Sequence, residues 1–198
     1  TLVADGDVNQ YAITPDGAWL RSDATLRALA QGPDALPEVL DASGTAVVPQ
    51  ADLAPARSGQ TVVVLPVLHG PRGEDGAVQG LLELAGVPYV GCGVLGSAVC
   101  MDKGVAKDLV AAAGIPQVRH LTVRDREVDD DVAKRVEAEL GWPVFVKPAN
   151  MGSSVGVSRA GDADELATAL AEAARFDEWL VVEEAGTARE IGGGGLGT

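Results

Sequence analysis

The sequence has little that would suit a membrane protein. Its longest apolar run, residues 62–68, is only seven residues long and contains Pro66. A membrane-spanning helix needs about 20 apolar residues, so this run fits a buried strand better. The chain also opens without a basic segment followed by an apolar one, which is the pattern of a secretory signal. We therefore expect a cytoplasmic location and no membrane partner.

Cysteine and positive charge are also scarce. Cys92 and Cys100 are the two cysteines, and neither has a histidine at metal-ligand spacing. This excludes a disulfide framework or a zinc site as the natural interpretation, and we expect both thiols in the core. The chain has 15 Lys and Arg residues and 29 Asp and Glu residues, which gives a net charge of −14. Such a chain is not expected to bind nucleic acid through phosphate contacts.

The first half of the chain has the pattern of an open α/β sheet. Apolar stretches flank residues 14–17, whose Pro-Asp-Gly sequence predicts the turn of a hairpin. Further on, residues 61–68 predict a strand, residues 74–85 a helix that ends near Gly86, and residues 87–90 a short second strand. This order predicts a β-α-β unit with parallel strands.

The second half alternates helices and strands again. We expect a domain boundary near residue 100, giving domains 1–100 and 101–198, and a fold class of α/β (α+β). The elements predicted in the second domain are helices at 102–113, 130–140 and 162–174, and strands at 117–123, 144–147 and 180–184.

Residues 69–80 follow the predicted strand 61–68, at the edge of the sheet where open α/β folds bind ligands. The segment holds His69, Glu74 and four glycines, and it opens a helix whose free amides suit an anion. An equally good interpretation is that Glu74 and Asp75 only favour the helix start and that His69 is a polar loop residue.

Two lysines and a glycine-bearing loop suggest phosphate binding. Lys147 ends a predicted strand and Lys103 begins a predicted helix, where compact ammonium groups can meet phosphates. Residues 152–156 bring two glycines together with the hydroxyls of Ser153 and Ser154, and could fold over a triphosphate. The alternatives are solvated surface lysines and a plain hairpin turn. The loop is not a Walker loop, because no Gly-Lys-Ser or Gly-Lys-Thr follows.

These segments, taken together, resemble a known family. Residues 69–76 read His-Gly-Pro-Arg-Gly-Glu-Asp-Gly, and Met-Asp-Lys follows at 101–103. Residues 145–150 read Phe-Val-Lys-Pro-Ala-Asn before the glycine-bearing loop, and Glu183-Glu184 precedes Arg189-Glu190. In this order, the motifs resemble those of D-alanine:D-alanine ligases, which belong to the ATP-grasp superfamily.

The resemblance implies roles for individual residues. His69, Glu74 and Ser153 would lie near the amine of the second D-alanine and form the catalytic set. Glu184 would act through its backbone, because the family usually has a basic or apolar residue there. The residues implied to bind ATP, from its phosphates to its adenine edge and ribose, are Lys103, Lys147, Ser154, Glu183, Glu184, Gly186 and Glu190.

The resemblance also implies a function and a fold. The function is ATP-dependent ligation of two D-alanines through an acyl phosphate, giving D-alanyl-D-alanine for peptidoglycan, with Mg²⁺ as cofactor and a homodimer as the assembly. The fold is an N-terminal, substrate-side domain followed by the first part of an ATP-grasp domain, with its nucleotide-binding lobe and adenine hinge.

Some family features are not found in these 198 residues. They are the glutamate of an N-terminal strand and the acidic residue and Glu-x-Asn pair that bind the metal. We therefore assign no metal ligands within the chain, and activity of the chain alone stays an open question. The alternatives are a D-alanine:D-lactate ligase, a non-catalytic nucleotide-binding fragment or pseudoenzyme, and another ATP-grasp carboxylate-amine ligase, which would not need residues 69–80.

Overall fold

The computed structural model describes residues 8–14, 16–21, 44–53, 59 and 61–186. It divides into two compact units, which we call the N-terminal unit (residues 1–65 and 81–90) and the C-terminal unit (residues 66–80 and 91–198). The predicted ribose contact Glu190 lies outside the described residues.

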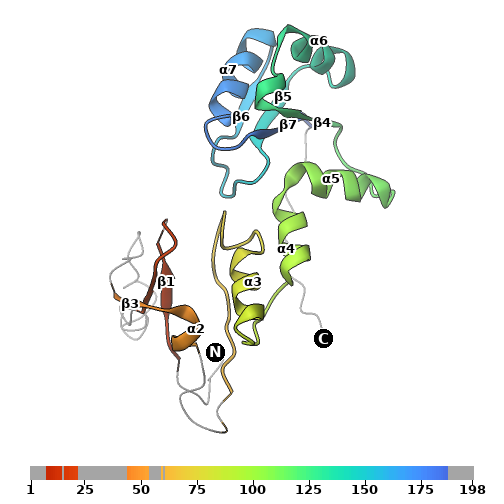
Figure 1. Ribbon diagram of the computed structural model, residues 1–198. Helices are drawn as coiled ribbons and strands as arrows, with labels where there is room; N and C mark the ends of the chain where they lie inside the picture. Colours follow the sequence, from red (N-terminus) through yellow and green to blue (C-terminus); the bar gives the residue numbers. More distant parts are fainter. Residues whose placement is uncertain (1–7, 15, 22–43, 54–58, 60, 187–198) are drawn as a thin grey trace, which may run out of the picture. The chain divides into compact units, whose positions relative to one another are not determined.

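The N-terminal unit contains a three-stranded antiparallel sheet of order β1-β2-β3 (Figure 1). Its strands are β1 (Tyr11–Ile13), β2 (Trp19–Arg21) and β3 (Thr45–Val47), followed by the short helix α2 (Pro49–Asp52). The predicted hairpin is confirmed, because the Gly17 amide donates to the Thr14 carbonyl at 2.8 Å and β1 pairs antiparallel with β2. Gly17 has a φ of 91°, a conformation that its missing side chain allows.

Helix α3 (Ala77–Leu84) forms where the apolar spacing predicts it. Val78 and Leu82, four residues apart, are both buried. The helix is followed by Gly86, whose φ of 66° and hydrogen bond to the Glu83 carbonyl give the expected glycine cap.

The predicted strand at 61–68 is wrong in its extent. Within the described residues its sheet pairing is one parallel bridge, in which Val64 donates to Pro88 and accepts from Val90, both at 2.9 Å. Val63 and Leu65 are 57% and 66% exposed. An apolar run becomes a strand only where a second backbone pairs with it, and the run itself does not supply that partner. The direction of the bridge agrees with the predicted β-α-β connection.

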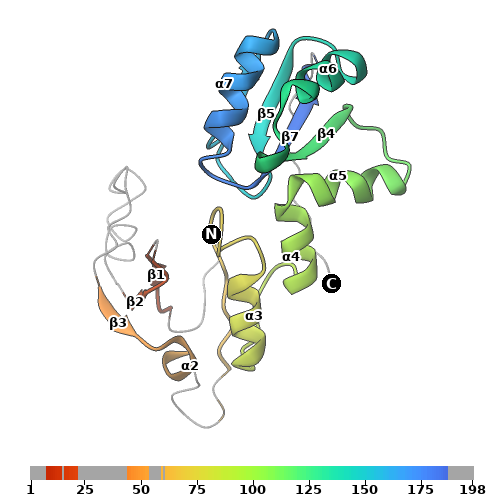
Figure 2. The ribbon, with the colours of Figure 1, turned by 45° about the horizontal axis from the view of Figure 1, so that its top comes forward.

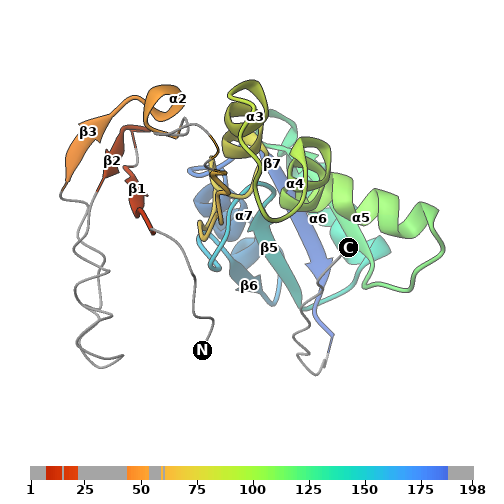
Figure 3. The same cartoon turned by 90° about the horizontal axis from the view of Figure 1, so that it is seen from below.

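Two helices open the main part of the C-terminal unit, α4 (Val94–Met101) and α5 (Lys103–Ala112), which follow one another directly (Figure 3). Helix α4 was not among the predicted elements. Asp102 separates the two helices and caps α5, since its Oδ1 accepts from the Val105 amide at 3.0 Å.

The expectation that both cysteines lie in the core is wrong, because Cys92 and Cys100 are exposed. The buried residues of α4 are Ser97 and Met101, which lie four positions apart on one stripe. Cys100 is one position off this stripe, and Cys92 precedes the helix.

The C-terminal unit is built on a four-stranded sheet of order β4-β7-β5-β6, in which every neighbouring pair is antiparallel. The strands are β4 (His120–Arg124), β5 (Val144–Pro148), β6 (Ser158–Ala160) and β7 (Trp179–Glu184), with a 3-10 turn, η2 (Asp125–Glu127), after β4. The strands predicted at 144–147 and 180–184 are confirmed within one residue. The one predicted at 117–123 begins three residues later.

Helices α6 (Asp130–Glu139) and α7 (Ala163–Ala173) cover one face of this sheet (Figures 1 and 2). Each begins at an aspartate cap: Asp129 accepts from two amides of α6, and Asp162 accepts from the Glu165 amide. Their apolar faces meet the sheet in a continuous core whose largest fully buried members include Leu166, Leu180 and Val136. Burying one such side chain contributes about 2 kcal/mol relative to exposure.

Alternation along the strands leaves the opposite face of the sheet for other residues. On β5, Val144 and Val146 join the core, while Phe145 and Lys147 point the other way. Helix α5 lies against this second face. A Cβ atom added to Gly104 would lie 3.1 Å from the Thr122 side chain of β4, so glycine allows the helix to approach closely.

Candidate functional site

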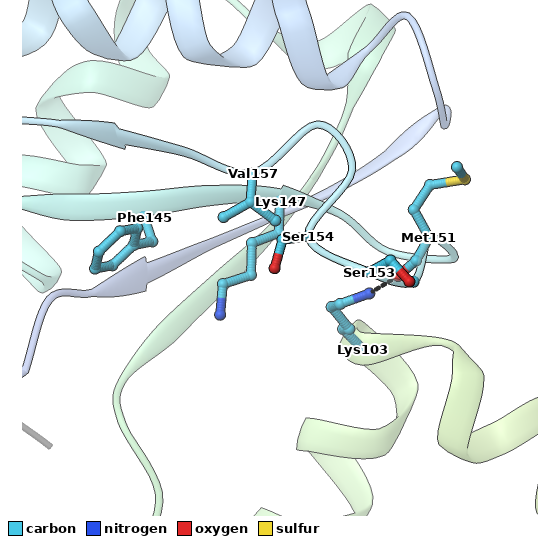
Figure 4. Close-up of a pocket in the computed structure, with 8 residues that line it drawn as sticks. Lys103, Phe145, Lys147, Met151, Ser153, Ser154 and Val157 are labelled. Atoms are coloured by element: carbon cyan, nitrogen blue, oxygen red, sulfur yellow. Dashed lines mark hydrogen bonds between the residues drawn. The ribbon is translucent and has the colours of Figure 1, made fainter. Parts of the chain in front are cut away.

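A cavity of about 350 Å³ opens on the second face of the C-terminal sheet. Figure 4 shows the Lys103 and Lys147 side chains directed toward the same space, one from the start of α5 and one from β5. The residues that line the cavity are Lys103, Phe145, Lys147, Met151, Gly152, Ser153, Ser154 and Val157. The structure thus brings together four of the predicted site residues, Lys103, Lys147, Ser153 and Ser154.

Lys147 shares a carboxylate with a third lysine. Its ammonium donates to Oε2 of Glu183 on the adjacent strand β7, while Nζ of Lys107 on α5 lies 3.1 Å from Oε1 of the same residue. The Glu183 side chain is 10% exposed. A carboxylate this well covered remains ionised only if it is paired, and here it has two partners.

The charge balance at Glu183 sets its pKa. Burial alone would raise the pKa of this carboxyl group, but the hydrogen bonds and charges of Lys147 and Lys107 outweigh that effect and lower it. Glu183 therefore carries a full negative charge at neutral pH.

Lys103 is held by backbone carbonyls. Its ammonium donates to the carbonyl oxygens of Ala149 at 3.1 Å and Met151 at 2.5 Å, and the second of these bonds is visible in Figure 4. The pKa of Lys103 is lowered, first by burial and then by the like charge of Lys147. Two ammonium groups that repel one another at a cavity form a site suited to an anion.

The loop over the cavity, residues 152–156, is called the serine loop below. Ser153 and Ser154 have φ values of 51° and 58°, and the Val155 amide donates to the Gly152 carbonyl at 3.1 Å. Two successive positive φ values across such a bond are typical of a type I′ turn, which normally selects Asn-Gly. Serine at both positions is strained, and strain of this kind is concentrated at functional sites.

Gly156 closes the serine loop and is required there. Its φ is 70°, and an added Cβ atom would lie 2.7 Å from Cγ of Pro148 and 2.8 Å from Cδ2 of Phe176. The loop therefore packs tightly against the end of β5.

The predicted catalytic residues His69 and Glu74 lie in the same C-terminal unit, but they do not line the cavity. Oε2 of Glu74 accepts from the Gly70 amide at 2.6 Å, and His69 is exposed. A Cβ atom added to Gly152 would lie 3.4 Å from Cα of Gly70 and 3.7 Å from Oε2 of Glu74. Residues 69–74 and the serine loop therefore meet at Gly152, one residue before Ser153.

Asp75 lies at the helix start, as one interpretation of the sequence suggested. Its carboxylate accepts from the Ala77 amide at 3.0 Å and from the Arg72 amide at 2.7 Å. It organises the turn that starts α3.

Glu184 is turned away from the lysines. Its carboxylate accepts from the Arg119 amide at 2.9 Å and from the Arg119 guanidinium at 2.7 Å. The Ala185 amide donates to the Pro143 carbonyl at 3.0 Å, and Gly186, the last described residue, is exposed. The Glu184 carboxylate is thus engaged by Arg119, and the backbone role that the resemblance implies for Glu184 stays a prediction.

No group of three or more His, Cys, Asp or Glu side chains within the described residues is arranged to hold a metal ion. Among the same residues, no helix has the length and apolarity needed to cross a membrane.

Comparison with protein families decides the identity of the chain. Residues 3–92 match the model of the D-ala D-ala ligase N-terminus, and residues 109–197 match that of the D-ala D-ala ligase C-terminus. The chain belongs to the D-alanine–D-alanine ligase family.

Similar relatives in the family include mycobacterial proteins. The D-alanine–D-alanine ligase of Mycobacterium sp. strain KMS is 47% identical over 198 residues, covering 93% of this chain and 53% of the relative. That of Mycobacterium tuberculosis strain H37Rv is 48% identical over 200 residues, covering 93% and 52%. The chain thus spans about half the length of the curated relatives it matches.

Solved structures of the D-alanine–D-alanine ligase family have the same fold. The enzyme from Coxiella burnetii has a TM-score of 0.71 at 35% identity, covering 89% of this chain and 53% of that one. The VanG D-Ala:D-Ser ligase from Enterococcus faecalis has a TM-score of 0.68 at 35% identity, covering 90% and 53%. These similarities place the chain in the ATP-grasp type of fold.

Among the described residues, Lys107 and Arg119 are charged contacts of predicted site residues that the sequence analysis missed. A signal for Lys107 exists, because it lies four residues after Lys103 and two side chains at this spacing share one face of a helix. The pairing of Lys107 and Lys147 around Glu183, which lies far along the chain, has no counterpart in local spacing.

Proposed function

We propose that this chain supplies the nucleotide-binding part of an ATP-dependent ligase that joins two D-alanines to D-alanyl-D-alanine for peptidoglycan. The observation that carries the proposal is the convergence of Lys103 and Lys147 at one cavity beneath the serine loop. Membership of the D-alanine–D-alanine ligase family supports the substrate.

The cavity fits a nucleotide triphosphate in its charge and its donors. Phosphate oxygens would meet two ammonium groups and the two serine hydroxyls. They would relieve the repulsion by Lys147, which acts after burial in lowering the pKa of Lys103. Phe145 adds an apolar surface on which a flat base can lie. We place Glu183 and the backbone of residues 184–186 along the adenine edge, and Glu190 at the ribose.

The residues do not fit a metal site on their own. Mg²⁺ prefers carboxylate oxygens together with phosphates, and no suitable cluster exists in the described part of the chain. We place the metal ligands outside these residues and assign no step to the metal.

The proposed reaction has two steps. A carboxylate oxygen of the first D-alanine attacks the γ-phosphorus of ATP, which forms an acyl phosphate and releases ADP. The amine of the second D-alanine then attacks the acyl carbon, the carbon–oxygen bond to phosphate breaks, and the amine loses a proton. What the protein supplies is the position of the reactants, neutralisation of charge and exclusion of water.

His69, Glu74 and Ser153 are proposed for the amine side of this reaction. The contact of residues 69–74 with the serine loop at Gly152 supports this grouping, because it puts the Glu74 carboxylate near the residue that precedes Ser153. A carboxylate and a hydroxyl are suitable acceptors for the hydrogens of an amine.

We also propose the domain division given by the sequence, with a substrate-side domain at 1–100 and the first part of an ATP-grasp domain at 101–198. The matched family ranges, which end at residue 92 and begin at residue 109, support a boundary near residue 100. A homodimer and a cytoplasmic location are part of the same proposal.

The test is phosphate release from ATP by the product of the complete reading frame that encodes these residues. We expect release to depend on D-alanine and not on L-alanine, with D-alanyl-D-alanine identified by mass. Adding D-lactate or D-serine beside D-alanine tests the second substrate, since the VanG D-Ala:D-Ser ligase has the same fold. No dependence on D-alanine would overturn the proposal and favour a non-catalytic nucleotide-binding protein or another carboxylate-amine ligase.

A further inference from the structure

Glu183 lies between two lysines of different kinds. Lys147 lines the cavity, while Lys107 approaches Glu183 from α5 and is not among the lining residues. The two ammonium groups contact different oxygens of one carboxylate, Lys147 at Oε2 and Lys107 at Oε1. Lys107 is 16% exposed, so its charge is also largely enclosed.

The charges explain why a second lysine is useful here. A buried carboxylate with a single ammonium partner forms a tight neutral pair, and that partner then has little positive charge to offer a ligand. A second ammonium on the other oxygen shares the negative charge, and the pair becomes a cluster with a net positive charge. Lys103, which the charges of Lys147 and Glu183 both influence, extends the same cluster.

We infer that Lys107 is a positioning residue that acts through Glu183: it fixes the carboxylate from behind and so keeps the Lys147 ammonium oriented and available for a nucleotide phosphate. This inference rests on the nucleotide site of the proposed function. It assigns Lys107 no contact with the nucleotide.

The side chain of Lys107 can be changed without disturbing the hydrogen bond between the Lys107 backbone and Gln117. The Lys107 carbonyl accepts from Nε2 of Gln117 at 2.6 Å, and this bond involves only the backbone. Methionine retains helix propensity and much of the length of lysine, so Lys107→Met removes chiefly the ammonium group.

The experiment measures ADP affinity by calorimetry in the product of the complete reading frame, with the melting temperature recorded for every variant. We expect Lys107→Met to weaken ADP binding by about tenfold, the effect of losing one charge-assisted hydrogen bond. Lys107→Arg keeps the charge and restores most of the affinity. Lys134→Met is the matched control, because Lys134 pairs with Asp131 on α6, across the sheet from the cavity.

A double substitution separates positioning from general stability. If Lys107 acts through Glu183 on Lys147, then Lys107→Met costs no further affinity in a Lys147→Met background, whereas an independent effect adds to it. Unchanged affinity in Lys107→Met, or full additivity in the double variant, would overturn the inference and leave the proposed function intact. Absence of ADP binding by the unsubstituted protein would overturn both.

Discussion

Arg119 and Glu184 are joined twice. The Arg119 amide donates to Oε1 of Glu184 and its guanidinium donates to Oε2, so one residue satisfies both oxygens of the carboxylate. The same guanidinium donates to the carbonyls of Glu139 and Leu140 at the end of α6. A single arginine therefore ties β4, β7 and α6 together just before the proposed adenine hinge.

Arg119→Met is expected to lower the melting temperature by a few degrees at pH 7. The variant loses bonds to three residues on two elements and leaves the Glu184 carboxylate without its guanidinium partner. Arg135→Met is the control, because among the described residues the partner of Arg135 is Glu139, in a long, exposed ion pair within α6. Equal losses in the two variants, measured by calorimetry, would contradict the role given to Arg119.

The same pair predicts a pH dependence. The backbone and side-chain hydrogen bonds of Arg119 lower the pKa of Glu184 below its ordinary 4.5. Stability that comes from a lowered carboxyl pKa is present above the ordinary value and is lost as the pH falls through the lowered one. The difference in melting temperature between the unsubstituted protein and Arg119→Met should therefore narrow below pH 4.5. A difference that stays constant from pH 7 to pH 3 would argue against this linkage.

Gly156→Ala and Gly114→Ala form a matched pair for the serine loop. Their φ values are 70° and 72°, so alanine is strained equally in both, by about 1 kcal/mol. Around Gly114 an added Cβ atom meets nothing within 4 Å, whereas at Gly156 it meets Pro148 and Phe176. We expect Gly156→Ala to cost about 3 kcal/mol in denaturant unfolding, the difference being overpacking. Equal losses of unfolding free energy in the two variants would show that the serine loop shifts easily to make room for the added methyl group.

Substitutions of the two serines in the loop should affect the KM values of different substrates. Under the proposed roles, Ser154→Ala raises the KM for ATP and Ser153→Ala raises the KM for D-alanine, each by about fivefold, the worth of one hydrogen bond. Each variant serves as the control for the other. Replacing either serine by glycine also removes the hydroxyl but relieves the positive φ, so the glycine variants should be no less stable than the alanine ones. An identical change of both KM values in both variants would argue for a general loosening of the loop.

Lys103 should give nucleotide binding an upper pH limit. Its pKa is lowered from 10.5 by burial and by Lys147, so its ammonium loses its proton sooner than an ordinary lysine as the pH rises. A phosphate binds the charged form, and ADP affinity is therefore expected to decline before the pH reaches 10.5. The ADP affinity of Lys103→Arg, which stays charged, should decline at a higher pH. Identical pH profiles for the two proteins would show that Lys103 does not bind the phosphate.

Local patterns predicted the C-terminal unit better than the N-terminal one. The sequence predicted strands β5 and β7 from their apolar residues. It also predicted helices α5, α6 and α7, which have an apolar period and begin at an aspartate cap. The segment 61–68 has a stronger apolar pattern than any of them, yet it forms a single bridge. The apolar pattern of a segment indicates that the segment will be buried. It does not indicate whether a neighbouring strand is present to form hydrogen bonds with its backbone.

Local patterns suggested the candidate site, but only the resemblance favoured it over the alternatives. Lys103 and Lys147 are 44 positions apart in the sequence, and taken singly each was more consistent with a solvated surface. Their meeting depends on how α5 lies against the sheet, which no local pattern encodes. For the same reason the sequence did not indicate that Lys107 would reach Glu183.

Alternate residues of the strands in the C-terminal sheet face opposite sides, one side being the core and the other the cavity. Val144, Val146, Leu180 and Val182 belong to the core beneath α6 and α7, while Phe145, Lys147 and Glu183 alternate with them and face the cavity side. Neighbouring residues of these strands therefore have different tasks: one packs in the core, and the next faces the cavity side of the sheet. What this face of the sheet binds could therefore be altered through every second residue of β5 and β7 while the core beneath α6 and α7 remains nearly unchanged.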